Sequence, residues 1–202
     1  GDGVKFKFNK FQFQLPLYGE YNVRNALGVI AIARYCGLSD GLIQDGFDTF
    51  TGVKRRMEIR GEVEGVTVID DFAHHPTAIR ETLRAVRARF PQRRIWAVFE
   101  PRSNTTRRNI FQNELAESLG QADRVVISSV VQSSQIPEPD LLNPEELVQN
   151  LSAAGMTAVY LPTTEAVIDH VLKHVEAGDV ICVLSNGGFE NLHERLIDRL
   201  KA

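Results

Sequence analysis

Two aspartates and two histidines meet at one junction of the sequence, VIDDFAHHPTAI, residues 68–79. Asp70 and Asp71 end an apolar run, and His74 and His75 precede Pro76, which suits the first turn of a helix because it has no N–H to leave unpaired. Carboxylates at the end of a strand can accept hydrogen bonds from ribose hydroxyls or from helix-start amides. These residues alone leave open a metal site, an acid–base pair and a capping cluster. Because adjacent histidines project apart and no further ligands are evident, we expect no metal site.

Two further loops carry residue types suited to binding. FEPRSNTTRR places Arg102, Ser103 and Asn104 after an apolar run, and a planar guanidinium there can grip a carboxylate at two points. LSNGGFENLH contains Ser185, Asn186, Gly187 and Phe189, and its glycines allow backbone amides to approach a ligand closely. A Gly-Gly pair also occurs in many ordinary turns.

The elements that would position these loops alternate regularly from residue 60 onward. RGEVEGVTVID predicts two short strands, and apolar β-branched runs predict strands at 95–99, 124–128, 157–161 and 180–184. Helical spacing predicts helices at 79–90, 110–119, 144–154, 164–175 and 189–200. This alternation indicates an α/β fold, a Rossmann-like, doubly wound and mostly parallel sheet with helices on both faces. In such a sheet ligands bind beyond the carboxyl ends of the strands, which selects the three loops.

The first part of the chain has a different pattern. Residues 1–17 show a strand pattern marked by phenylalanines, and helices are predicted at 22–35 and 40–50. A strand and two helices bury little by themselves, and the sequence has no initiator methionine. We therefore expect a piece of a longer protein, in which 1–58 is the tail of one domain and 59–202 is a complete second domain.

Composition excludes some classes of function. The net charge of −3 argues against a nucleic-acid binder, whose affinity depends on neutralising phosphates. No apolar run approaches membrane-spanning length and no charged-then-apolar leader opens the sequence, so we expect a soluble cytoplasmic protein.

Two cysteines and a histidine pair have simple expected roles. Cys36 and Cys182 stand among apolar neighbours without CxxC spacing, so we expect two buried, reduced thiols. His170 and His174 are one helical turn apart, a spacing that suits a metal, but both lie off the predicted apolar face. Solvated surface histidines are therefore expected.

Three segments together resemble the Mur ligases, the ATP-dependent amide-forming enzymes of peptidoglycan precursor synthesis. They are YGEYNVRNALGVIAIA, FTGVKRRMEIRG and DDFAHHPTAI, and their order and spacing match those of the family across essentially the whole chain. The resemblance implies that Asn22 and Asn25 hold the adenine end of ATP, that Arg56 meets the terminal phosphates and that Asp71 holds the ribose. His74 and His75 belong to the same junction.

Within the family, EPRSNT and SNGGF are more similar to ligases that attach the tripeptide L-Ala-γ-D-Glu-meso-diaminopimelate to UDP-N-acetylmuramate, in peptidoglycan recycling, than to those that attach L-alanine. The resemblance implies that ATP phosphorylates the muramyl carboxylate and that the peptide amine attacks the acyl phosphate, with Mg²⁺ required. The tripeptide would be recognised by two groups of residues: Arg102, Ser103 and Asn104, and Ser185, Asn186, Gly187 and Phe189.

The sequence departs from the family in one respect, because it lacks the GxxxxGK[ST] phosphate loop. We expect that loop and most Mg²⁺ ligands to precede residue 1, assign no catalytic residue within this sequence, and expect the chain alone to be inactive. Two alternatives remain: a UDP-N-acetylmuramate:L-alanine ligase, and a non-enzymatic nucleotide-binding α/β module.

Overall fold

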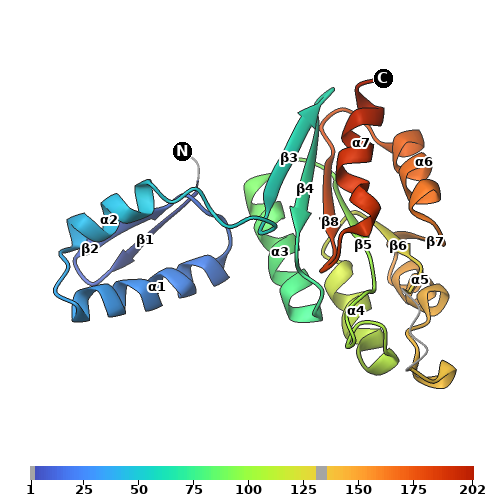
Figure 1. Ribbon diagram of the computed structural model, residues 1–202, viewed down its shortest axis with the longest axis horizontal. Coiled ribbons are helices and arrows are strands. Elements are labelled where there is room, and N and C mark those ends of the chain that lie inside the picture. Colours follow the sequence, from blue (N-terminus) through green and yellow to red (C-terminus); the bar gives the residue numbers. More distant parts are fainter. Residues whose placement is uncertain (1–2, 131–135) are drawn as a thin grey trace.

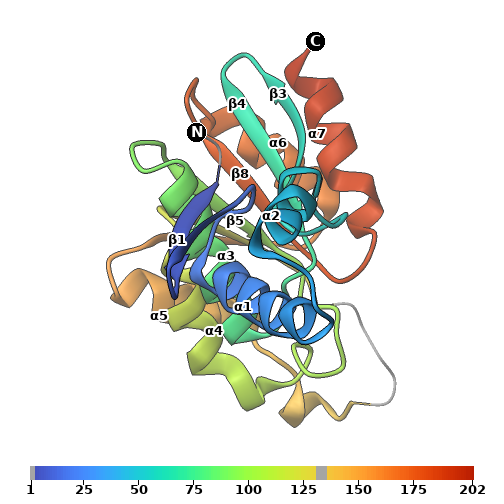
Figure 2. The same ribbon diagram turned by 90° about the vertical axis from the view of Figure 1, so that its left-hand side faces the viewer.

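A smaller and a larger lobe make up the protein, joined by a connector at residues 49–57 (Figure 1). The computed structural model describes residues 3–130 and 136–202. The smaller lobe holds strands β1 (Val4–Phe8) and β2 (Phe11–Leu15) and helices α1 (Glu20–Tyr35) and α2 (Asp40–Asp48). All later elements belong to the larger lobe, and Figure 2 shows the smaller lobe in front of it.

The expected single strand at the start of the chain is wrong, because it is a hairpin. Phe8 pairs with Phe11 across a two-residue turn in which Asn9 has a φ of 56°. Such a left-handed conformation suits asparagine and lets the chain reverse. Phe13 is fully buried between the hairpin and the helices and packs edge-on against Phe47 of α2, so the helices of this lobe are held by one face of the hairpin.

The larger lobe is built on a six-stranded sheet in the order β3-β4-β8-β5-β6-β7. Edge strand β3 (Glu58–Val63) is antiparallel to β4 (Val66–Asp71), and all other neighbours are parallel. The mostly parallel sheet confirms the predicted fold class. The remaining strands have the predicted bounds: β5 (Ile95–Phe99), β6 (Arg124–Ser128), β7 (Thr157–Leu161) and β8 (Val180–Leu184).

Helices cover both faces of this sheet, as the sequence predicts. Alternate residues along β5 face opposite ways, so Ala97 packs with one cluster and Trp96 with the other. The first cluster holds α3 (Pro76–Arg89), α4 (Gln112–Leu119) and α5 (Pro144–Ala153), and the second holds α6 (Thr164–His174) and α7 (Leu192–Leu200). Short 3₁₀ turns lie at Asn109–Phe111, Glu138–Asp140 and Phe189–Asn191.

Two expected helix starts come later in the structure. The helix expected at 110 is a 3₁₀ turn until Gln112. The helix expected at 189 begins at Leu192, because Phe189, Glu190 and Asn191 have φ values of 42°, 47° and 55°, which are incompatible with a right-handed helix.

The two lobes touch beside the connector. Tyr18 and Tyr21, before and within α1, pack against the core of the larger lobe, and the Arg89 guanidinium of α3 lies over the Tyr18 ring at 5.3 Å. At the end of the connector, Met57 donates its N–H to Asp71 of β4 at 2.8 Å. The last residues of the connector are therefore bonded to the larger lobe.

Candidate functional site

The three loops selected from the sequence begin side by side at one edge of the sheet. Leu184, the last residue of β8, pairs with Asp71 of β4 on one side and with Phe99 of β5 on the other. The chain then leaves β5 toward α4 on one face and leaves β8 toward α7 on the opposite face. The place between the carboxyl ends of β8 and β5, where the connections turn to opposite faces, is thus the position at which ligands bind in open α/β sheets.

Asp71 is enclosed at the centre of this edge. It is 1% exposed, its Oδ2 accepts the Met57 N–H, and its Oδ1 accepts from the Ala73 N–H at 2.8 Å and from the Thr82 hydroxyl at 3.2 Å. Burial raises the pKa of Asp71, opposed by these hydrogen bonds and by the positive charge of Arg56. The carboxylate therefore fastens the connector to the start of α3. The predicted contact with a ribose stays a prediction.

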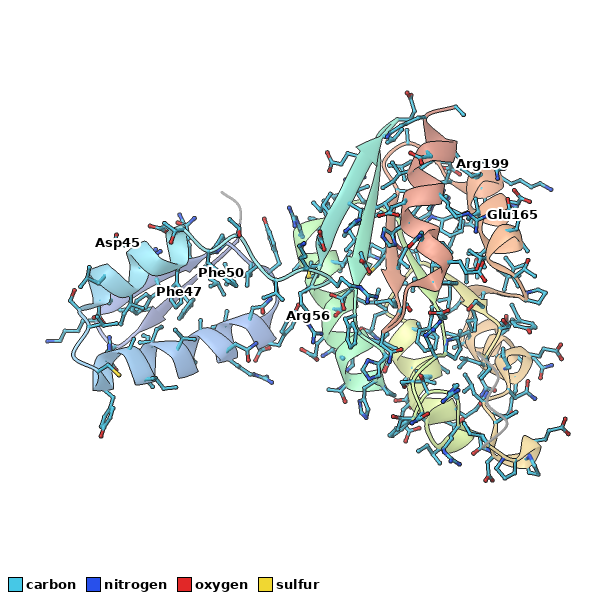
Figure 3. All side chains as sticks on the ribbon, viewed as in Figure 1. Asp45, Phe47, Phe50, Arg56, Glu165 and Arg199 are labelled. Carbon is cyan, nitrogen blue, oxygen red and sulfur yellow. The ribbon has the colours of Figure 1, made fainter. Side chains whose placement is uncertain are left out.

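The other three residues expected to face ATP share one cavity. Asn22, Asn25, Arg56 and Tyr21 are its polar lining residues, and apolar side chains of the smaller lobe and the connector line the rest of its roughly 800 Å³. Arg56 lies where the connector meets the larger lobe (Figure 3), with its guanidinium 5.6 Å from the Phe72 ring centre. Amide groups beside an apolar wall suit a nucleobase, and a guanidinium suits phosphate.

Tyr21 is a residue of this cavity that the sequence reasoning missed. Burial, together with the nearby negative charge of Asp71, raises the pKa of Tyr21 to about 12. The phenol therefore stays neutral at physiological pH. Tyr21 is the first residue of the motif YNVRN, directly before Asn22, and this position in the motif could have indicated its place in the cavity.

Loops 100–108 and 185–191 are joined by a buried carboxylate, Glu100, which the sequence reasoning also missed. The Ser185 hydroxyl donates to Glu100 Oε2 at 2.5 Å and accepts the Gly187 N–H at 2.9 Å. The Arg102 guanidinium lies 3.6 Å from Glu100 Oε1 and remains about half exposed. These contacts bring together the predicted arginine and the predicted glycine loop.

A cleft of about 480 Å³ opens beside these loops at the ends of β5, β6 and β7. Its lining mixes charges of both signs with small polar groups: Glu100, Arg102, Ser128, Ser129, Pro162, Thr163, Thr164, Glu165, Phe189, Glu190 and Arg195. A ligand that carries both carboxylates and ammonium groups matches this lining better than a purely anionic one does.

The remaining predicted residues build the loops themselves. Ser103 accepts the Thr106 N–H at 3.1 Å, and Asn104 accepts a hydrogen bond from Arg107. The Asn186 Oδ1 is buried and has no hydrogen-bond partner among the described residues, and Phe189 is buried against the α6 and α7 side of the sheet.

His74 and His75 begin helix α3. His75 is its N-cap and accepts the Thr77 N–H at 3.3 Å, and the His74 ring bonds the Phe72 carbonyl at 3.1 Å. In residues 3–130 and 136–202 no group of three or more His, Cys, Asp or Glu side chains could hold a metal. Over the same ranges no helix is long and apolar enough to cross a membrane.

Two smaller expectations about single residues are wrong. Cys182 is buried, as expected, whereas Cys36 is exposed after the end of α1. His170 and His174 are half-buried, with ring centres 4.4 Å apart, and His170 also packs edge-on against Trp96.

Comparison with known proteins decides the family. A family model described as Mur ligase, glutamate ligase domain, matches residues 55–187. The chain belongs to the Mur ligase family. The matched region starts at Arg55 and contains β3 to β8, the first two loops of the site and the beginning of the third, through Gly187.

Individual Mur ligases are similar over nearly all of this chain. The UDP-N-acetylmuramate–L-alanyl-γ-D-glutamyl-meso-2,6-diaminoheptandioate ligase of Escherichia coli is 42% identical over 91% of the chain and 38% of its own length. The UDP-N-acetylmuramate–L-alanine ligase of Acaryochloris marina is 36% identical over 90% of the chain and 38% of its own length. A murein peptide ligase structure from Psychrobacter arcticus is 37% identical, with a TM-score of 0.71, over 99% of the chain and 42% of its own. The chain thus spans about two fifths of the length of these relatives.

Proposed function

We propose that this chain supplies the nucleotide-facing and peptide-binding part of an ATP-dependent ligase. The reaction would join L-Ala-γ-D-Glu-meso-diaminopimelate to UDP-N-acetylmuramate in peptidoglycan recycling, in the cytoplasm, where ATP is available. One observation carries the proposal: Arg55 and Arg56 are consecutive, yet Arg55 bonds the loop that contains Ser185 and Gly187, whereas Arg56 lines the cavity of Asn22 and Asn25. Residues suited to phosphate and to peptide therefore meet at one turn.

The proposed domain division follows from this arrangement. Residues 1–58 would be the end of a central ATP-binding domain, and residues 59–202 would be the peptide-binding domain. The exposed apolar cavity of the smaller lobe is consistent with a domain whose core continues elsewhere. The chain by itself would then hydrolyse no ATP, and measurable ATP turnover by the purified chain would contradict the division.

The proposed chemistry assigns limited roles to residues of this chain. ATP would transfer its terminal phosphoryl group to the muramyl carboxylate, giving ADP and an acyl phosphate. Attack by the peptide amine would then form the amide and release phosphate and a proton. Arg56 would offset negative charge on the phosphates, and Arg102 would orient a peptide carboxylate. Most ligands of the required Mg²⁺ would lie outside the described residues, which contain no group of three or more His, Cys, Asp or Glu side chains that could hold a metal.

The tripeptide is favoured over L-alanine by the cleft beside Arg102. Its roughly 480 Å³ exceed what one alanine needs, and its mixed charges suit the carboxylates and ammonium group of diaminopimelate. The 42% identity to the E. coli tripeptide ligase supports the same choice. An L-alanine ligase remains the second candidate, because relatives with that activity are 36% identical over a similar span.

Titration calorimetry of the chain with the tripeptide, and separately with L-alanine, tests the proposal. We expect the tripeptide to bind and alanine to give no heat beyond dilution. Tripeptide binding should weaken in Arg102→Ala and persist in Arg108→Ala. Arg108 is a control arginine of similar exposure, whose guanidinium lies 3.9 Å from the Asp140 carboxylate. Selective binding of alanine would transfer the assignment to the second candidate.

A further inference from the structure

The guanidinium of Arg55 clamps the loop that follows β8. Its Nη2 donates to the carbonyl oxygens of Ser185 at 2.5 Å and of Gly187 at 2.7 Å. Its Nε lies 3.3 Å from a carboxylate oxygen of Asp70, which is almost fully buried. The carbonyls on either side of Asn186 are thus held by one side chain that comes from the connector between the lobes.

The backbone of Arg55 is fixed as firmly as its side chain. Its N–H donates to Glu58 Oε2 at 2.8 Å, and its carbonyl accepts the Phe72 N–H at 2.9 Å. Arg55 and Met57 have φ values of 57° and 50°, a left-handed conformation that non-glycine residues adopt only when their surroundings impose it. The turn therefore has one shape, which directs Arg55 to the loop after β8 and Arg56 to the cavity of Asn22 and Asn25.

Lysine in place of Arg55 could not make all of its contacts with the loop and with Asp70. Two carbonyls and a carboxylate are reached by one planar group, which also lies 5.1 Å from the Phe72 ring centre. In Arg55 the Nε pairs with Asp70 while the Nη2 donates to both carbonyls, whereas a lysine has a single nitrogen and cannot occupy both places at once.

The loop held by Arg55 contains a buried hydrogen-bond acceptor that is unpaired among the described residues, the side-chain oxygen Oδ1 of Asn186. Because a buried acceptor without a donor costs about 1–3 kcal/mol, such an atom is expected where a ligand supplies the donor. The amine or ammonium group of the incoming peptide is a donor of the right kind.

We propose that Arg55 is a positioning residue, which holds loop 185–188 so that Asn186 Oδ1 can accept an N–H of the incoming peptide. This inference rests on the proposed function for the nature of the ligand. The hydrogen bonds by which Arg55 holds the loop do not depend on that function. Because Arg56 is the next residue, the same turn fixes the distance between the phosphate-facing and peptide-facing groups.

The test compares Arg55→Lys with Arg60→Lys in the 202-residue chain. Arg60 is a matched control because its side chain is 28% exposed, close to the 31% of Arg55, and its ion pairs are with Glu58 and Glu194 rather than with groups of the loop. Lysine keeps a positive charge near Asp70, so Arg55→Lys should fold. Amide hydrogen exchange is measured at Ser185 and Gly187, together with tripeptide affinity and the melting temperature.

In Arg55→Lys we expect exchange at Ser185 and Gly187 to speed up about tenfold and the tripeptide dissociation constant to rise about tenfold, with the melting temperature nearly unchanged. Arg60→Lys should change neither quantity. Asn186→Ala should weaken binding as much as Arg55→Lys does, and Asn186→Asp, which keeps an acceptor, should restore most of it.

The outcomes separate this inference from the proposed function. Unchanged exchange at Ser185 and Gly187 in Arg55→Lys would overturn the clamp. Faster exchange with an unchanged tripeptide affinity would overturn the role of the clamp in binding. If the wild-type chain binds no tripeptide but the Arg55→Lys chain shows faster exchange at Ser185 and Gly187, the result would count against the proposed function and support the clamp.

Discussion

Gly187 and Arg102 leave no room for a side chain between them. A β-carbon placed on Gly187 would lie 2.2 Å from the Cδ and 2.3 Å from the Nε of Arg102, well inside van der Waals contact. The neighbouring Gly188 has open space around its α-carbon and an ordinary φ of −81°. The first glycine of the pair is therefore required by the position of the arginine, and the second is not.

Gly187→Ala should displace the Arg102 guanidinium and weaken tripeptide binding about tenfold, the effect of losing about 1.4 kcal/mol of interaction. The melting temperature should fall little, since Arg102 is half exposed and can swing outward. Calorimetric titration measures the affinity, and Gly188→Ala is the control that should bind like wild type. Equal affinities in the two variants would separate Arg102 from peptide binding.

Asp71→Asn should destabilise the chain by about 1–3 kcal/mol at neutral pH. Three donors surround the carboxylate: the Met57 and Ala73 N–H groups and the Thr82 hydroxyl. An asparagine has only one acceptor oxygen, so its NH₂ group must face at least one of these donors. Urea unfolding measures the loss, with the exposed Asp45→Asn, visible on α2 in Figure 3, as the control.

This prediction tests only the structural role of Asp71. Stability should fall whether or not the carboxylate meets a ribose. An Asp71→Asn chain as stable as wild type would show that the three hydrogen bonds contribute nothing net to folding.

The sheet could be predicted from the sequence because its strands are buried on both faces. β5 and β8 are continuous apolar runs of five residues, IWAVF and VICVL, β6 has the apolar run VVI at its centre, and each lies between polar loops. Such runs leave little choice of boundary. The positions of the three candidate loops then follow from the parallel topology, since the carboxyl ends of parallel strands lie at the same side of the sheet.

Local backbone geometry and long-range contacts could not be predicted in this way. The alternation of residues 4–15 breaks between Phe8 and Phe11, but that break alone does not specify a turn, and the left-handed Asn9 is what reverses the chain there. The role of Arg55 depends on partners about 130 residues away in the sequence, so no local pattern could identify it. The burial of Asp71 likewise depends on the connector folding back onto β4.

Asp179→Ala should destabilise the chain by about 3 kcal/mol, the cost of breaking a buried ion pair at one partner. Asp179 is 3% exposed; its carboxylate accepts from Arg94 at 2.8 and 2.9 Å, and from the Trp96 indole at 2.8 Å. Burial acts to raise the pKa of Asp179, but these hydrogen bonds outweigh it and the pKa is lowered. Chemical unfolding measures the loss, and Asp169→Ala, at an exposed partner of Arg199, should cost far less. Similar losses in both variants would contradict the importance of the buried cluster.

His170 should make the chain less stable as the pH falls below about 6.5. Burial, followed by the nearby His174, Arg124 and Lys173, lowers the pKa of His170 from its ordinary value of 6.5. The unfolded chain therefore takes up the proton first, so stability is fully present above pH 6.5 and is lost as the pH falls toward the folded-state pKa. His170→Gln removes this titration, so the drop in melting temperature between neutral and mildly acidic pH should be smaller than in wild type. An NMR titration of the His170 ring should give a midpoint below 6.5, and a midpoint at or above that value would contradict the lowered pKa.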